Sequence, residues 1–200
     1  MEFSEVVRRR RMVRRFDPSR PVPEAVLHRA LGNAVRAPNA GFSQGWDFLV
    51  LTGAPARERF WRACSDDVDT PDRWLAGMLT APVLVLCLGD EQRYRQRYAR
   101  ADKAATVGRR SPVPWWCVDP GMAALLILLT AVDEGLGGCF FGVPEARWAG
   151  LLDTFGVPAD RVPVGVVALG HPAPDDRSRP LAGRRRPLAE VVHWEEFGRS

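Results

Sequence analysis

One long apolar segment in the second half of the chain constrains the fold more than any other feature. From Gly121 to Glu134 the side chains are hydrophobic around nearly the whole circumference of an expected helix, and Gly135 follows as a stop signal. Asp119 and Pro120 predict the start of this helix, because Asp is a preferred capping residue and proline is favoured in a first turn. A helix that is apolar on all sides must be covered on all sides. We therefore expect a central helix or a subunit interface.

Four shorter apolar runs predict strands. They are Phe48–Leu51, Pro82–Leu88, Cys139–Phe141 and Pro163–Leu169. The second run shows no polar alternation, which is typical of a strand buried on both faces. Helical patterns are expected over residues 3–11, 23–36, 56–65, 74–79, 90–107 and 145–155. We see no internal repeat and no domain boundary, so we expect residues 1–200 to form one domain.

The composition is that of a globular protein without a metal centre. Hydrophobic residues make up 46% of the chain, charged residues make up 26%, and the net charge is +4. The four cysteines are scattered, and no histidine lies at metal-ligand spacing from them, so we expect buried thiols and no zinc site. The run Met122–Val132 is shorter than the roughly 20 residues that span a bilayer, and we see no signal peptide. We expect a cytoplasmic protein with no membrane partner.

Arginine is concentrated near both ends of the chain. Six of the eight residues from Arg8 to Arg15 are arginine, and Arg184, Arg185 and Arg186 form a second cluster. Guanidinium groups bind phosphate with a planar, permanently charged fork. We therefore hypothesise that folding brings both clusters to the phosphate of one cofactor. There are two alternatives: the arginines form a solvated basic helix end, or they form an arm that binds nucleic acid. Two observations argue against a nucleic-acid arm. Acidic residues are spread along the chain, and no aromatic residues interleave with the arginines to stack on bases.

Four motifs in the same order resemble those of the FMN-dependent nitroreductase family. Arg10–Phe16, with the sequence RRMVRRF, resembles the N-terminal flavin-phosphate motif, and Ala37–Phe48 resembles the segment that covers the flavin. Gly135–Gly137 resembles the Gly-Leu-Gly that follows the family's long helix. Leu169–Pro172, followed by Arg185–Leu188, resembles the C-terminal phosphate-binding tail. The resemblance extends over most of the chain.

The resemblance implies an α+β fold of the nitroreductase type. Such a fold is a three-layer α-β-α arrangement with a central, mainly antiparallel sheet and a long central helix at a homodimer interface. The implied cofactor is FMN, the implied co-substrate is NAD(P)H, and the implied acceptor is a small electron-poor molecule such as a nitroaromatic or a quinone. We expect a ping-pong mechanism in which hydride passes from NAD(P)H through flavin N5 to the acceptor. Because the flavin carries this chemistry, no catalytic side chain is expected.

The resemblance also implies a set of flavin-binding residues. The arginines at both ends correspond to a phosphate clamp, residues 38–40 to a segment that covers the flavin of the partner subunit, and residues 140–142 to a strand whose backbone approaches flavin N5. The set comprises Arg10, Arg11, Met12, Arg14, Pro38, Asn39, Ala40, Gln44, Phe140, Phe141, Gly142, Arg184, Arg185 and Arg186.

The aromatic residues near the covering segment and before the long helix suggest a substrate pocket. We expect Phe42, Trp115 and Trp116, with the loop 108–114, to line this pocket, although aromatic residues also build ordinary cores. Met12, Phe42 and Gly45 stand where the family has serine, asparagine and proline. These departures leave two alternatives open: an oxidase or other specialised redox enzyme of the same fold, and a flavin-binding protein without turnover.

Overall fold

A four-stranded antiparallel sheet forms the middle layer of the structure, a computed structural model that describes residues 1–106, 112–174 and 185–199. The strand order is β1-β2-β4-β3, and each neighbouring pair is antiparallel. The strands are β1 (Trp46–Leu51), β2 (Val83–Asp90), β3 (Gly137–Phe141) and β4 (Arg161–Gly170). Every residue of β2 is buried, as its uninterrupted apolar sequence predicts. Strand β3 lies at an edge of the sheet.

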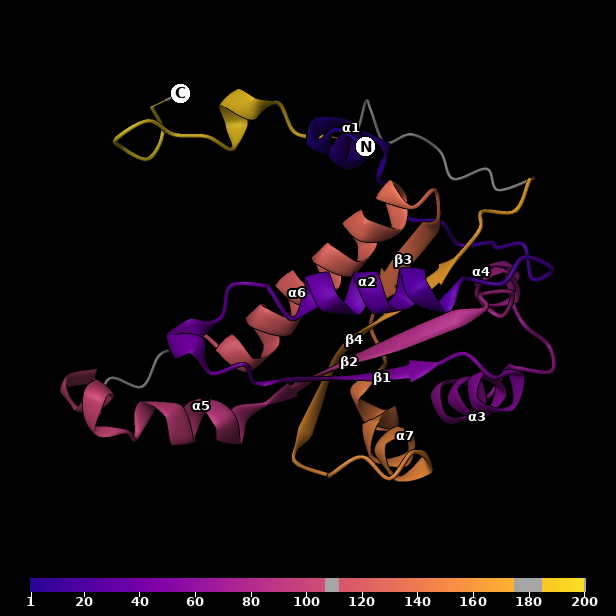
Figure 1. The fold of residues 1–200 in the computed structure, drawn as a ribbon, viewed down its shortest axis with the longest axis horizontal. Helices are drawn as coiled ribbons and strands as arrows, with labels where there is room; N and C mark the ends of the chain where they lie inside the picture. Colours follow the sequence, from indigo (N-terminus) through magenta and orange to yellow (C-terminus); the bar gives the residue numbers. More distant parts are fainter. Residues whose placement is uncertain (107–111, 175–184, 200) are drawn as a thin grey trace.

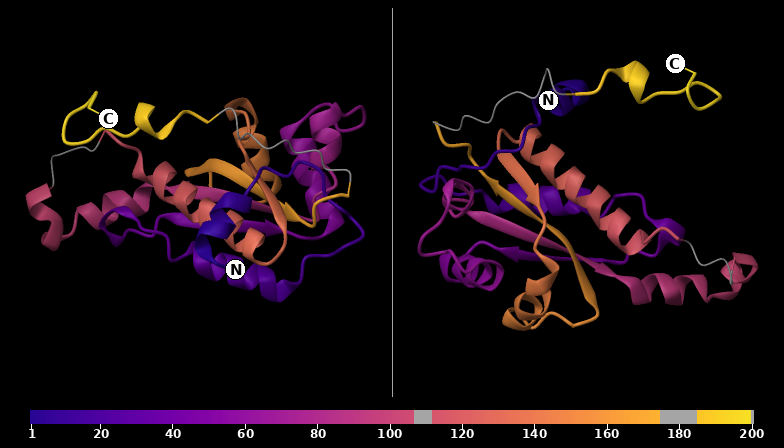
Figure 2. Two further views of the ribbon diagram at one scale, coloured as in Figure 1. Left: turned by 90° about the horizontal axis from the view of Figure 1, so that it is seen from above. Right: turned by 180° about the vertical axis from the view of Figure 1, so that it is seen from behind.

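Helices cover both faces of this sheet (Figures 1 and 2). On one face, α6 (Trp115–Asp133) and α2 (Glu24–Ala34) pack on Val83, Val85 and Cys87. On the other face, α3 (Ala54–Cys64), α4 (Arg73–Met78) and α7 (Trp148–Thr154) pack on the alternating residues of the same strand. Successive side chains of a strand point to opposite faces, so one strand contributes to both cores. The predicted three-layer α-β-α arrangement with a long central helix is therefore confirmed.

The central helix α6 starts earlier than its sequence predicts. It begins at Trp115, after Pro114, so Asp119 is not its capping residue and Pro120 lies inside it. Because proline has no N–H, the carbonyl of Trp116 lacks its usual helical donor. That carbonyl approaches β2 so closely that a Cβ on Gly89 would collide with it. The helix is long and apolar enough to cross a bilayer, but it packs against the sheet and α2, as a core helix does.

The N-terminal and charged helices also differ from expectation. Helix α1 (Phe3–Arg9) ends before Arg10, and the chain then becomes extended. Helix α5 (Glu91–Tyr98) was expected at the surface, but its Tyr94 is buried at 4% exposure. The remaining short turns are the 3-10 helices η1 (Ala40–Phe42), η2 (Ala101–Thr106), η3 (Glu145–Arg147) and η5 (Leu188–Glu190).

Candidate functional site

The arginine-rich segment lies against the outer edge of β3. Met12 forms a parallel bridge with Gly138, and the N–H of Val13 donates to the carbonyl of Gly138 at 3.0 Å. Buried Val13 and Phe16 anchor this segment, and the N–H of Phe16 donates to the hydroxyl of Thr80 at 2.8 Å. The chain must leave the helix here, because only an extended backbone can pair with an edge strand. The arginines between these anchors are therefore held along the edge of the sheet.

A cavity of about 260 Å³ lies at the start of β3. Its lining consists of Arg9, Arg11, Val13, Val132, Gly135, Leu136, Gly137 and Pro172. A Cβ on Gly137 would lie 2.6 Å from a methyl of Val13, so this close approach requires glycine. Two guanidinium groups beside a glycine-rich turn suit an anion such as a phosphate. We call this cavity the basic pocket.

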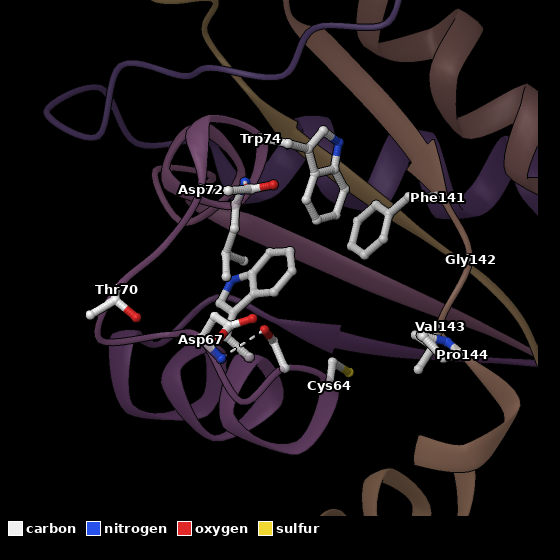
Figure 3. A pocket seen from close by; sticks show the side chains of 12 residues that line it. Cys64, Asp67, Thr70, Asp72, Trp74, Phe141, Gly142, Val143 and Pro144 are labelled. Carbon is white, nitrogen blue, oxygen red and sulfur yellow. Dashed lines mark hydrogen bonds between the residues drawn. The ribbon is translucent and has the colours of Figure 1, made fainter.

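A second cavity, of about 340 Å³, lies at the end of β3 (Figure 3). Phe141 stacks on Trp61 with ring centroids 5.5 Å apart, and Trp74 packs edge-on against Phe141 at 5.6 Å. The indole nitrogen of Trp61 is buried and has no hydrogen-bond partner in the part of the chain that the structure describes. The other side of the cavity is polar, with Asp67, Thr70 and Asp72. We call this cavity the aromatic pocket.

Strand β3 connects the two pockets. Gly137 lines the basic pocket and Phe141 lines the aromatic pocket, and the four residue steps between them span about 13 Å in a strand. Arg14 follows Val13, whose N–H donates to Gly138, so its backbone lies near the middle of this path. Burial raises the pKa of the Cys139 thiol, and the charge of Arg14 opposes the increase. The carbonyl of Gly138 points to the outer edge of β3, where it accepts the hydrogen bond from Val13. Because every second residue of a strand has the same orientation, the N–H and carbonyl of Phe140 point to that edge too.

The segment 38–44 and the two tryptophans lie at the opposite end of α6. The N–H of Ala40 donates to Asp119 near the start of the helix at 2.8 Å, whereas the N-terminal amine contacts Asp133 at its end at 2.5 Å. A helix of 19 residues is about 28 Å long. Trp116 packs edge-on against Tyr94 at 6.4 Å in this same region. One chain therefore does not bring these predicted residues to the arginines and β3.

The C-terminal arginines are also apart from the N-terminal ones. Arg186 pairs with Glu190, with 3.3 Å between Nε and Oε2, and among the described residues no hydrogen bond or ion pair joins it to the N-terminal cluster. The segment that follows runs away from the body of the protein (Figures 1 and 2). Within it, Leu188, Trp194 and Phe197 are exposed. Arg184 and residues 108–111 lie outside the described residues. Among the described residues, the two arginine clusters therefore do not meet within one chain.

Sequence reasoning missed the aromatic pocket. Trp61 and Trp74 were not among the expected site residues. The available signal was an aromatic pair in the otherwise charged helix α3, where Phe60 and Trp61 stand among arginines. Such residues indicate one buried helix face, and this pattern does not distinguish a core from a pocket.

Comparisons with known proteins place the chain in a family. The model of the Nitroreductase family matches residues 7–171, so the protein belongs to this family. An NADH dehydrogenase from Thermus thermophilus is 27% identical over 93% of this chain and 92% of its own length.

Two solved structures share the fold. The NADPH:FMN oxidoreductase from Vibrio harveyi, complexed with NAD⁺, has a TM-score of 0.73 at 20% identity and covers 99% of this chain and 79% of its own. A structure from Exiguobacterium sibiricum in complex with FMN has a TM-score of 0.76 at 20% identity over 98% of both chains.

Proposed function

We propose that this protein is an FMN-dependent NAD(P)H oxidoreductase that transfers hydride to a small electron-poor acceptor. The observation that carries the proposal is the path along β3, with a basic pocket at one end and an aromatic pocket at the other. FMN has the matching layout, a phosphate joined to a flat ring by a five-carbon chain. The names of the related proteins, an NADH dehydrogenase and an NADPH:FMN oxidoreductase, support the same class of reaction.

The residues present suit FMN. Arg9, Arg11 and Arg14 supply cationic donors for the phosphate and the polar chain, and charge-assisted hydrogen bonds contribute about 1.5–3 kcal/mol each. Trp61, Trp74 and Phe141 give the aromatic pocket flat apolar surfaces for a bound ring. When bound, the flavin supplies the hydride chemistry at N5. The backbone of residues 140–142 lies at the open sheet edge, where the N–H of Phe140 can bond that region of the ring.

The site is shared between two copies of the chain in this proposal. In a two-fold dimer through antiparallel α6 helices, the start of one helix lies beside the end of the other. The segment 38–44 of one copy then covers the site of its partner. The exposed face of α6 supports this arrangement, because Val118 and Leu125 are seven residues apart and both are exposed. The C-terminal segment, with Arg185 and Arg186, reaches the partner's phosphate site in the same way.

The side chains serve to bind and orient. Phe42, Trp115 and Trp116 enclose the acceptor from the partner's side and exclude water from the ring. A nicotinamide and an acceptor use the same position in turn, which is a ping-pong sequence. When bound, the flavin carries the electron transfer. We place the protein in the cytoplasm.

Anaerobic mixing with NADH and NADPH tests the proposal. The purified protein, saturated with FMN, should lose its flavin absorption after one of the two nicotinamides is added, and a nitroaromatic or a quinone should restore it. Reoxidation by oxygen alone would indicate an oxidase. A flavin spectrum that neither nicotinamide changes would contradict the proposed activity and indicate a flavin-binding protein without turnover.

A further inference from the structure

A buried carboxylate inside α6 contacts the segment 39–45. The side chain of Asp119 is 0% exposed, and its Oδ2 accepts hydrogen bonds from the hydroxyl of Tyr94 at 2.6 Å and from the N–H of Ala40 at 2.8 Å. Among the described residues, its buried Oδ1 has no hydrogen-bond partner. Burying a carboxylate with neutral donors and one unsatisfied oxygen costs stability. Such a group in a central helix calls for a functional reason.

The segment that Asp119 holds has an unusual backbone. Gly41, Phe42 and Gln44 have φ angles of 64°, 56° and 50°, in the left-handed region. For the two residues other than glycine this conformation is strained, and it persists only where the surroundings determine it. Phe42 is nevertheless 73% exposed, so its ring gains little from packing in one chain.

Helix α5 holds the other side of the same segment. Arg97 donates from Nε to the carbonyl of Gly41 at 2.7 Å. The ring of Tyr94 packs on Gly45 so closely that a Cβ there would collide with it. Within the segment, the side-chain oxygen of Asn39 accepts from the N–H of Gln44 at 2.9 Å. Tyr94 thus contacts the segment directly and through Asp119, which joins α5, α6 and η1 in one hydrogen-bonded unit.

We infer that Asp119, together with Tyr94, is a positioning residue that fixes the segment 39–45 so that Phe42 forms a wall of the acceptor pocket in the partner's site. The strained backbone turns an aromatic ring outward, and the buried carboxylate stabilises that conformation through the N–H of Ala40. An aromatic ring fixed in this way can pack on a planar acceptor with little loss of conformational entropy. The inference rests on the proposed function. It assigns the two residues to binding at the position that the nicotinamide and the acceptor occupy in turn, and it gives them no part in the hydride transfer itself.

Three variants test the inference. Asp119→Ala removes both accepted hydrogen bonds, and Tyr94→Phe removes one while keeping the ring that packs on Gly45. Thr154→Val is the matched control, because it removes a hydroxyl hydrogen bond, to the carbonyl of Gly150 at 2.6 Å, in α7 on the other face of the sheet. The first measurement is hydrogen–deuterium exchange of the peptide 37–45 in the protein as purified, which requires no turnover. We expect faster exchange in Asp119→Ala and Tyr94→Phe and unchanged exchange in Thr154→Val.

The second measurement separates acceptor binding from hydride transfer to the flavin. For Tyr94→Phe we expect an acceptor KM raised about five- to tenfold, the size of one lost hydrogen bond, with the anaerobic rate of flavin reduction at saturating NAD(P)H unchanged. Unchanged exchange in Asp119→Ala would overturn the inference. An unchanged acceptor KM in Tyr94→Phe, or an equal change in Thr154→Val, would overturn it too. A wild-type protein that neither nicotinamide bleaches would instead contradict the proposed function, and the exchange data would still decide whether Asp119 fixes the segment.

Discussion

The N–H of Val13 donates to the carbonyl of Gly138 at 3.0 Å and ties the arginine-rich segment to the outer strand of the sheet. This bond places a basic segment beside a glycine-rich turn, and it leaves the remainder of the β3 edge open. A run of arginines that would repel one another on a helix is instead held extended. The local arrangement thus offers cationic donors and backbone groups on one edge, which is what a phosphate-bearing cofactor requires.

The phosphate clamp predicts a loss of flavin when its arginines are removed from both ends of the chain. Replacing Arg14 and Arg186 together with alanine should yield mostly colourless protein that is still dimeric, because the phosphate loses two charge-assisted bonds. Each single variant should weaken FMN binding by about tenfold or more. Arg62→Ala is the control, because Arg62 on α3 pairs with Glu58 of the same helix and with Asp69 in the turn that follows it. Full flavin content in the double variant would refute the clamp.

The shared site predicts that flavin binding depends on the exposed face of α6. Leu125 is 47% exposed in one chain, so in a monomeric protein a charge there would be tolerated. In a dimer through α6, Leu125→Glu buries a charge and should give monomers that bind FMN weakly. Gel filtration and flavin titration measure both effects. Ala149→Glu, on exposed α7 across the sheet, should leave both unchanged, and a Leu125→Glu dimer with normal flavin would contradict this interface.

The contact between α6 and β2 predicts a sensitive glycine. A Cβ on Gly89 would collide with the carbonyl of Trp116, which is backbone and cannot rotate away. Gly89→Ala should lower the free energy of unfolding by about 1–3 kcal/mol or more, as overpacking does. Gly150→Ala has open space around the new methyl and lies in helix α7, so it should stabilise slightly. Urea unfolding measures the stability of both variants. If Gly89→Ala were as stable as Gly150→Ala, α6 and β2 would be able to move apart to accommodate the new methyl group.

The buried thiol of Cys87 predicts a loss of stability at high pH. Burial raises the pKa of Cys87 from 9.0 to about 12, because the thiolate is disfavoured in the folded core. This contribution is fully present below pH 9 and is lost as the pH rises toward 12, since only the unfolded state then releases the proton. Cys87→Ala should be less stable at neutral pH by about 1 kcal/mol. The difference in stability between Cys87→Ala and the wild type should shrink above pH 9. A difference in urea midpoints that stays constant with pH would contradict the raised pKa of Cys87.

The layers of the fold could be predicted from sequence because their signals are local. The apolar run around β2 and the apolar helix α6 carry their burial in their composition, and both lie where the sequence places them. The start of α6 could not be predicted. Asp119 and Pro120 form a typical helix start, yet Pro114 lies one residue before the observed helix and also suits one. Only the carboxylate's contacts with Tyr94 and Ala40 show why Asp119 lies in the interior.

The site was only partly accessible from sequence. The arginine motif predicts an anion-binding segment, and the structure holds that segment at β3. The aromatic pocket depends on Trp61 and Phe141, which are far apart in sequence and meet only because β3 lies beside α3 and α4. The separation of the segment 38–44 from the arginines follows from the length of α6, which no motif encodes.

The central claim is that two copies of the chain hold FMN between them. Gel filtration of the purified protein mixed with FMN, with protein and flavin absorption recorded together, tests it most directly. We predict a single dimer peak that carries the flavin band, and loss of that band from the monomer peak of Leu125→Glu. A flavin band on a monomer, or a dimer that elutes without flavin, would contradict the account.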